Sequence, residues 1–419
     1  MPALRALRPR TRRYKVSRRG PGRGRLGLGA AAAAVLALTA CGAPGAQNTQ
    51  AEAITPARPS SPITLTVLDG AGNVTVQRAI YDGFAAAHPE LVSSINYQSA
   101  PAPDVAGKVR AQQIAGAVDI GVVIGGTDVL GAAQTENLML PLLPDHAADL
   151  PDLAQVQDED IAAMQEMANG VGVVNRYGPA GPLLAHRPGQ LAEAPSTPED
   201  LLAWAREHPG QFTYAQPPNS GPGRTLLMSL PYMLGDGNPS DPENGWAKTW
   251  AYLQELGRYV SSYPPSSTIM NQQFGSGQLQ LIPTIVSMDI NNRKDGTWAP
   301  DTQVSLFADQ QWVSDAHYMM VPKGVSPETL YVALELIKWT LQPEQQAMTY
   351  ATGALTTANK EATPERAPAD GRAMLQQWGR PDFYPQALGT GAFHTPLTPE
   401  NQVKAFEIWQ REVGSRVGS

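Results

Sequence analysis

The sequence predicts an α/β fold with open, mostly parallel sheets, divided into two lobes. Between residues 63 and 124, short apolar runs alternate with longer amphipathic stretches. This alternation is typical of βαβ units, which build parallel sheets flanked by helices. About 360 residues remain when the N-terminal leader is set aside, which is more than one hydrophobic core usually organises.

The first elements are predicted to alternate between strand and helix. Residues 63–68 alternate β-branched and other apolar side chains and predict a strand, after which residues 69–72 predict a loop. Residues 118–124 form a nearly continuous apolar run, as expected of a buried parallel strand. Between these two strands we expect a helix at 74–87, a strand at 94–98 and a helix at 104–115.

Three later helices are predicted from the residues at their starts. Ser or Thr, then Pro, then Glu occurs at residues 197–199, 326–328 and 398–400. The hydroxyl can accept from a free amide, proline suits the first turn, and the acidic side chain favours the positive helix end. We therefore expect helices at 201–206, 329–341 and 403–413; a further apolar strand is expected at 279–286.

The N-terminal residues predict export and a lipid anchor. Ten Lys or Arg and no acidic residue occur before residue 26, and an apolar run at 26–38 is too short to span a bilayer. Leu38-Thr39-Ala40-Cys41 resembles the lipobox of bacterial lipoproteins, in which the signal peptide (1–40) is cut before a cysteine that carries the lipid. Residues 41–61 predict a flexible tether. The expected location is the outer face of the cell membrane, held by the lipid on Cys41.

Composition excludes several classes of partner and chemistry. Without the ten leader residues, the 31 basic residues fall to 21 against 38 acidic ones, a net charge near −17. Such a charge disfavours nucleic acid and anionic lipid surfaces. Cys41 is the only cysteine, the six histidines show no ligand spacing, and common hydrolase, nucleotide and zinc motifs are missing from the sequence. We therefore expect no enzymatic activity, no cofactor and no metal site.

Loops after the predicted strands are candidates for ligand binding, because open α/β sheets bind ligands beyond the carboxyl ends of their strands. Residues 69–72 and 125–128 occupy such positions, and the second loop leads into a helix. At residues 212–225 a short strand runs into a Pro/Gly loop and then a helix, where Asn219, Ser220 and free amides would present donors near Arg224. The same glycines and prolines would also suit plain turns and helix caps.

Several segments match the patterns of one family. Residues 197–205 and 212–221 are similar to its TW-x-DLL-x-W … Y-x-x-P-x-x-x-G region, residues 274–279 to x-x-G-E-x-x-L, and residues 336–346 to F-x-x-F-L-x-S-P-E-A-Q. Residues 316–324 resemble the strand that returns to the first lobe. In this order the segments resemble the extracellular solute-binding components of ABC importers, in a branch related to thiamine, polyamine and iron receptors.

The resemblance implies a two-lobed type II periplasmic-binding-protein fold with a ligand cleft between the lobes. It places lobe 1 at residues 62–178 and 303–345 and lobe 2 at residues 179–302 and 346–415. A small solute would enter the cleft and the lobes would close over it. The protein, as a monomer, would then deliver the solute to an ABC permease and its ATPase.

The resemblance also implies which residues touch the solute. They follow predicted strands or lie at the crossings between lobes; Arg176 and Tyr177, near the first crossing, are weaker candidates. The predicted ligand-binding residues are Asp69, Gly72, Gly126, Thr127, Asp128, Asn219, Ser220, Arg224, Ser287, Asp289, Asn291, Asp315 and His317.

The sequence favours an organic cation or zwitterion as the solute, resembling thiamine or a polyamine. Four predicted cleft carboxylates could surround a cation, and three aromatic side chains could add a π face. These residues are Asp69, Asp128, Asp289 and Asp315, with Tyr214, Trp298 or Trp312.

Other interpretations are left open at this level. Arg224 at a helix start would instead favour a phosphate, sulfonate or carboxylate. Iron is disfavoured, because the paired tyrosines of the iron receptors do not occur in the sequence. The chain as a whole could alternatively be a lipid-anchored secreted hydrolase, or a sensor or adhesin that binds without transport.

Overall fold

The computed structural model describes residues 54–70, 72–191 and 193–416. The predicted signal peptide, Cys41 and the tether up to residue 53 lie outside the described residues. Within the described ranges, no helix combines the length and the apolar character that a membrane crossing requires.

The larger of two sheets has the strand order β2-β1-β3-β8-β4, with β9 paired to β8. Strand β1 is parallel to β2 and β3, whereas β8 is antiparallel to both β3 and β4. The carboxyl ends of β1, β2 and β3 therefore meet at one edge of the sheet. Its strands are β1 (Ile63–Asp69), β2 (Val92–Ser99), β3 (Ile120–Gly125), β4 (Val173–Gly181), β8 (Gln311–Met320) and β9 (Ala392–His394).

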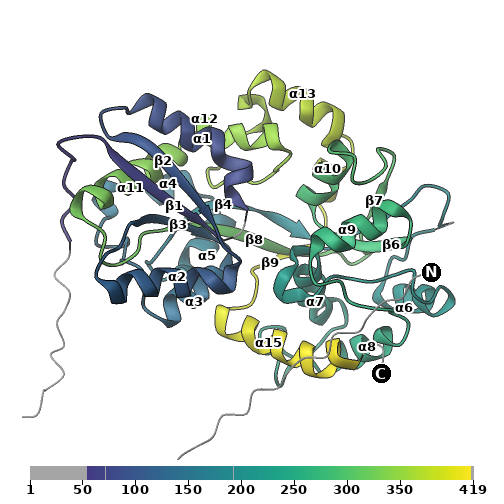
Figure 1. The fold of residues 1–419 in the computed structure, drawn as a ribbon. Coiled ribbons are helices and arrows are strands. Elements are labelled where there is room, and N and C mark those ends of the chain that lie inside the picture. Colours follow the sequence, from purple (N-terminus) through teal and green to yellow (C-terminus); the bar gives the residue numbers. More distant parts are fainter. Residues whose placement is uncertain (1–53, 71, 192, 417–419) are drawn as a thin grey trace, which may run out of the picture. The chain divides into compact units, whose positions relative to one another are not determined.

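Helices cover both faces of this sheet (Figure 1). One face carries α1 (Asn73–Ala87), α11 (Pro327–Thr340) and α12 (Pro343–Ala347), and the other carries α2 (Ala102–Ala115), α3 (Thr127–Thr135) and α5 (Glu159–Met167). The short helix α4 (Leu153–Val156) precedes α5. Fully buried side chains such as Leu65, Phe84 and Leu336 join sheet and helices in one core. We call this part the large lobe.

The smaller sheet has the order β6-β5-β7, with β5 (Leu183–His186) between β6 (Leu281–Thr284) and β7 (Gln303–Ser305). The surrounding helices are α6 (Pro198–Glu207), α7 (Gly221–Met233), α8 (Ala247–Gly257), α9 (Ser267–Ser276) and α10 (Val286–Lys294). They form separate cores around Trp246, Trp298 and Ile290. We call this part the small lobe.

The predicted α/β class with two lobes is confirmed, but the smaller sheet corrects one detail. Mostly parallel sheets were expected in both lobes, whereas β6 and β7 both pair antiparallel to β5. The unit β6–α10–β7 still joins two strands of the same direction through a helix. Because β5 lies between β6 and β7, these two parallel strands are not neighbours in the sheet. Since β7 belongs to this sheet, the chain returns to the large lobe along β8, not at residue 303.

Strand β8 belongs to both lobes. Its first half contributes Trp312 and Val313 to the small-lobe cores, and its second half contributes Tyr318 and Met320 to the large-lobe core. The C-terminal helices α13 (Ala369–Trp378), α14 (Tyr384–Ala387) and α15 (Pro399–Glu412) follow. Trp409 of α15 is buried in the small lobe, while Gln402 near its start accepts a 3.4 Å hydrogen bond from Thr127 on α3.

The elements predicted from local patterns form, with small shifts of their ends. The predicted capping residues Thr197, Ser326 and Thr398 each accept a hydrogen bond from an amide of the helix they precede. The strand expected at 279–286 is shorter, because β6 ends at Thr284 and α10 begins at Val286. This difference brings the first turn of α10 to the end of a strand.

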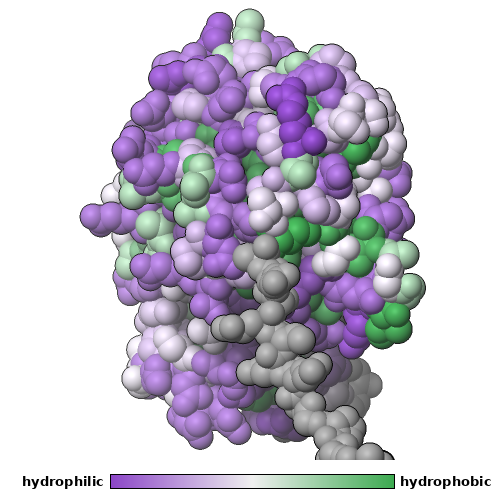
Figure 2. Space-filling model, turned by 90° about the vertical axis from the view of Figure 1, so that its left-hand side faces the viewer, coloured by the Kyte–Doolittle hydropathy of each residue, from purple (hydrophilic) through white to green (hydrophobic). Residues whose placement is uncertain are grey.

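The face in Figure 2, at the large-lobe end, is mainly hydrophilic, with its hydrophobic residues scattered among polar ones. Across the described residues, large hydrophobic side chains are exposed on different elements: Ile114 on α2, Ile269 on α9, Phe393 on β9 and Val403 on α15.

Candidate functional site

A cavity of about 450 Å³ lies between the two lobes. Its floor comes from the paired strands β4 and β8. One wall comes from the large lobe and one from the small lobe, and Leu355 and Thr356 complete the lining. The charged or titratable side chains around it are Asp128, Arg176, Arg224, Asp315 and His317.

Most of both walls is made by the starts of helices. On the large-lobe side these are the starts of α1, α2 and α3, which follow β1, β2 and β3. On the small-lobe side they are the starts of α7, α9 and α10. Because free amides and the positive end of the helix dipole gather at helix starts, this arrangement surrounds the cavity with donors.

The register of β4 and β8 sets the charges on the floor. Arg176 pairs with His317 and Gly178 with Asp315. The carboxylate of Asp315 lies 3.3 Å from the guanidinium of Arg224 on α7 and 3.5 Å from Nε2 of His317. Burial alone would raise the pKa of Asp315, but Arg224, His317 and Arg176 outweigh it and hold that pKa well below its usual range. Asp315 is therefore ionised and neutralises Arg224.

Arg176 occupies a different environment on the same floor. Its Nη1 donates a 3.5 Å hydrogen bond to Asn73, and its buried Nε has no hydrogen-bond partner among the described residues. Burial lowers the pKa of Arg176, although Asp315 acts in the opposite direction. Among the described residues no carboxylate lies within 4.0 Å of this guanidinium, so Asp315 and Asp69 compensate its charge only at longer range.

The start of α7 is organised by serine contacts. Ser220 accepts from the amide of Gly223 at 3.0 Å, and Ser267 at the start of α9 donates to Ser220 at 2.9 Å. Glycine is required at position 223, because a Cβ there would lie 2.1 Å from the carbonyl oxygen of Ala215. The Pro/Gly loop singled out in the sequence thus packs α7 closely and fixes Arg224 over the floor.

Nine of the thirteen predicted residues line the cavity. They are Gly72, Gly126, Asp128, Asn219, Ser220, Arg224, Ser287, Asp315 and His317. Asp69, Thr127, Asp289 and Asn291 are absent from the lining. Asp69 is buried and accepts from Asn73 and from the amide of Val74, so it caps α1 behind the wall. Thr127 is fully buried against Gln402.

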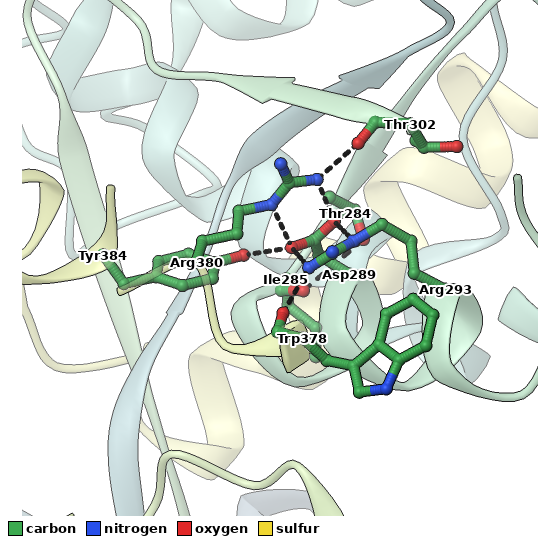
Figure 3. Close-up of polar contacts among 8 residues, drawn as sticks. All are labelled: Thr284, Ile285, Asp289, Arg293, Thr302, Trp378, Arg380 and Tyr384. Carbon is green, nitrogen blue, oxygen red and sulfur yellow. Dashed lines mark hydrogen bonds and ion pairs between the residues drawn. The ribbon is translucent and has the colours of Figure 1, made fainter. Parts of the chain in front are cut away.

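Asp289 lies behind the cavity, at the centre of a buried cluster (Figure 3). Its carboxylate accepts two hydrogen bonds from Arg293, two from Arg380 and one from Tyr384, at 2.8–3.0 Å. Burial would raise the pKa of Asp289, but the two arginines outweigh it and lower that pKa. Asp289 therefore joins α10 to the segment between α13 and α14. Asp289 belongs to the first turn of α10, but its side chain is fully buried in this cluster and does not line the cavity.

The expected cation pocket is not assembled. Asp69 and Asp289 lie outside the lining, and Asp315 is neutralised by Arg224. Tyr214, Trp298 and Trp312 are at most 1% exposed and pack in the cores. The ring of four carboxylates with an aromatic face therefore does not form.

Sequence reasoning also missed residues that the fold brings to the cavity. Arg176, only a weaker candidate from its position near the first crossing, lines the cavity. Residues 266–268 line the wall through the start of α9, and their Ser-Ser-Thr pattern is the one local signal for a helix start there. Leu355 and Thr356 carry no recognisable signal, since they reach the cavity through the path of the C-terminal segment.

The chemistry of the lining is that of reversible polar binding. Within the part of the chain that the structure describes, no group of three or more His, Cys, Asp or Glu side chains could hold a metal ion. The lining combines hydroxyls, helix-start amides and two guanidiniums around a space that fits a small molecule.

The sequence profile of the family described as "Bacterial extracellular solute-binding protein" matches residues 79–376, well over half of the chain. A curated relative, Protein YnjB of Escherichia coli (strain K12), is 24% identical over 197 residues, which are 44% of this chain. The chain spans about half the length of this relative.

Solved structures of ABC transporter proteins share the fold. An ABC transporter structure from Clostridium perfringens is similar with a TM-score of 0.63 and 15% identity, covering 84% of this chain and 100% of that one. The spermidine/putrescine ABC transporter substrate-binding protein PotD from Streptococcus pneumoniae is similar with a TM-score of 0.56 and 13% identity, covering 83% and 99%.

Asp315→Asn should lower the free energy of unfolding by about 3 kcal/mol at pH 7, because it leaves Arg224 buried without its partner. The folded-state pKa of Asp315 is depressed, so its contribution is present above the unfolded-state pKa and lost as pH falls below about 4. Urea unfolding of both proteins between pH 7 and pH 3 measures the difference. Asp301→Asn, at an exposed position, is the control. If the difference in the free energy of unfolding between the wild type and Asp315→Asn grew as the pH fell, this account would be wrong.

Asp289→Asn should also lower the free energy of unfolding by about 3 kcal/mol, because Arg293 and Arg380 would both lose their buried carboxylate partner. Asp301→Asn, at an exposed position, provides the matched control and should change stability by less than about 0.5 kcal/mol. Chemical unfolding at pH 7 measures both. Equal stabilities of the two variants would show that the cluster does not hold α10 in place.

Proposed function

Because the chain belongs to the bacterial extracellular solute-binding proteins, we propose that it is the solute receptor of an ABC importer. One observation carries this proposal: a polar cavity lies between two lobes that have separate cores and are joined by β4 and β8. A receptor of this kind binds its solute between the lobes and presents the closed form to a membrane permease.

Closure would take place about the crossings between the lobes. These are β4, β8 and the segment at 353–357, which follows the large lobe and lines the cavity with Leu355 and Thr356. The amide of Thr357 donates to the carbonyl of Tyr177 at 2.9 Å, which ties this segment to β4. Rotation of packed lobes about a few such residues is an established kind of domain closure.

Of the solute classes left open by the sequence, we infer a zwitterion and not a plain organic cation. The cavity offers Arg176 and Arg224 as cations and Asp128 and Asp315 as anions, and the Arg224–Asp315 pair balances itself. Arg176 on the floor and Asp128 on the large-lobe wall then remain for the two charges of a solute. Among the described residues, Asp128 is the one cavity carboxylate without a guanidinium within 4.0 Å, but Arg224 still acts on it at longer range, so a polyamine would find little uncompensated negative charge.

We infer that a lipid on Cys41 holds the receptor at the outer face of the cell membrane. The lipobox-like residues 38–41 and the basic, then apolar leader support this location. Two or three acyl chains would retain the protein on a bilayer, where one alone is marginal. The tether of about 20 residues would let the receptor reach its permease while it stays attached.

A thermal-shift screen of the purified protein tests the receptor function. The set should contain amino acids and other zwitterions, polyamines, thiamine derivatives, sulfonates and phosphonates. A solute at 100 times its Kd should stabilise the folded state by about 2.7 kcal/mol and raise Tm.

Small-angle X-ray scattering checks closure with the solutes that bind. The radius of gyration should fall with a binding solute and stay constant with a non-binding one such as sucrose. If no solute in the set raised Tm or changed the scattering, the receptor function would be wrong. Turnover of ester or glycoside substrates by the same protein would favour a hydrolase.

Replacing Cys41 by serine tests the anchor, because the hydroxyl cannot form the thioether that carries the lipid. The wild-type protein expressed in a lipoprotein-producing bacterium should sediment with membranes and incorporate a clickable fatty acid. The Cys41→Ser variant should do neither. Ser60→Ala, in the tether, serves as the control. Fatty-acid labelling that persisted in Cys41→Ser would exclude this anchor.

A further inference from the structure

The first turn of α10 presents unused amides to the cavity. Val286, Ser287 and Met288 all line it, and the preceding Ile285 has no side-chain acceptor. Within the described residues, none of these three amides has a hydrogen-bond acceptor. The other two small-lobe helix starts at the cavity differ: Ser220 accepts from an amide of α7 and Ser266 from an amide of α9. A ligand acceptor at α10 would satisfy donors that the protein leaves free.

The buried cluster behind this turn adds positive charge. Asp289 directly follows Met288, and an acidic residue there would normally offset the positive helix end. Its carboxylate is instead shared by the guanidiniums of Arg293 and Arg380, so that two positive charges face one negative charge (Figure 3). The cluster therefore leaves a net positive charge beside the free amides.

The floor contributes a second, independent feature. Arg176 has no carboxylate within 4.0 Å among the described residues, and its Nε has no partner. His317, only 9% exposed, lines the same cavity with Nδ1 unpartnered. Strand β4 lies against the start of α10, because a Cβ at Gly181 would come within 3.2 Å of the Ile285 side chain. Arg176, His317 and the first turn of α10 thus border one cavity.

We propose, resting on the receptor function above, that the first turn of α10 and Arg176 form a subsite for a compact acidic group of the solute. A carboxylate fits this subsite, because its oxygens can accept from helix-start amides and from a guanidinium together. Asp128 is left for a cationic group on the opposite wall. The solute class is therefore a small molecule with one acid and one amine, such as an ω-amino acid.

Three matched series test the acidic group: ω-amino acids of four to six carbons, the corresponding ω-amino amides, and diamines of the same length. Calorimetric titration of the wild-type protein should detect the amino acids and give at least about a hundredfold weaker binding for amides and diamines. Binding of the diamines or amides as tight as that of the acids would overturn the subsite, while the receptor function would stand.

Variants of Ser287 locate the subsite. Ser287→Asp places a carboxylate among the free amides, where it suits the helix start, so the fold should be as stable as in the wild type. Acid binding should weaken at least about a hundredfold, because like charges brought together are strongly unfavourable. Ser287→Asn, similar in size and uncharged, should bind within about tenfold of the wild type.

Thr268→Asp on α9 separates a local effect from a general one. It adds the same charge to the same cavity, but at a helix start that Ser266 already caps. We expect Thr268→Asp to weaken acid binding clearly less than Ser287→Asp does. Equal losses would overturn the assignment to α10. If none of the three series binds, Ser287→Asp is tested on the solute found by thermal shift, and an unchanged Kd would overturn the subsite.

Discussion

The antiparallel pairing of β4 and β8 is the constraint on which the site depends. These two strands connect the lobes, and their register decides which side chains stand on the floor of the cavity. It brings Arg176 beside His317 and Gly178 opposite Asp315, although the paired residues are more than 130 positions apart in the chain. A shift of one residue would turn the charged side chains to the other face, since side chains alternate along a strand. The apolar ends of β8, buried in both cores, fix that register.

The two sheets explain why so many helix starts meet at one place. In the large lobe, parallel β1, β2 and β3 end at the same edge, and each is followed by a helix that begins at that edge. In the small lobe, β6 does the same with α10 in an otherwise antiparallel sheet. The cavity lies where these edges face one another. Backbone amides, which only a proline substitution removes, thus supply much of its donor character.

Two aspartates with similar partners have different roles. Asp315 is on the floor and balances Arg224, so it sets the charge that a solute meets. Asp289 has no access to the cavity and ties α10 to the C-terminal segment through Arg380 and Tyr384. Each carboxylate accepts hydrogen bonds from a largely buried guanidinium, and leaving that guanidinium without a partner would cost free energy of folding. The two roles differ because the residues occupy different positions in the fold. In the sequence both are aspartates next to apolar segments of similar appearance.

The sequence by itself determined the elements and the class of fold. These features depend on residues that are neighbours in the chain, so local sequence patterns predict them. They are the strand alternation at 63–68, the buried run at 118–124 and the hydroxyl-Pro-Glu helix starts. The rule that ligands bind beyond the carboxyl ends of parallel strands pointed to Gly72, Gly126 and Asp128, and the family resemblance pointed to the other six cavity residues. Tertiary structure alone decided that Asp289 turns into a cluster, that Tyr214 and Trp298 are core residues, and that Arg176 stands unpaired on the floor. Those outcomes depend on partners far away in the chain, such as Arg380, and local sequence carries no record of them.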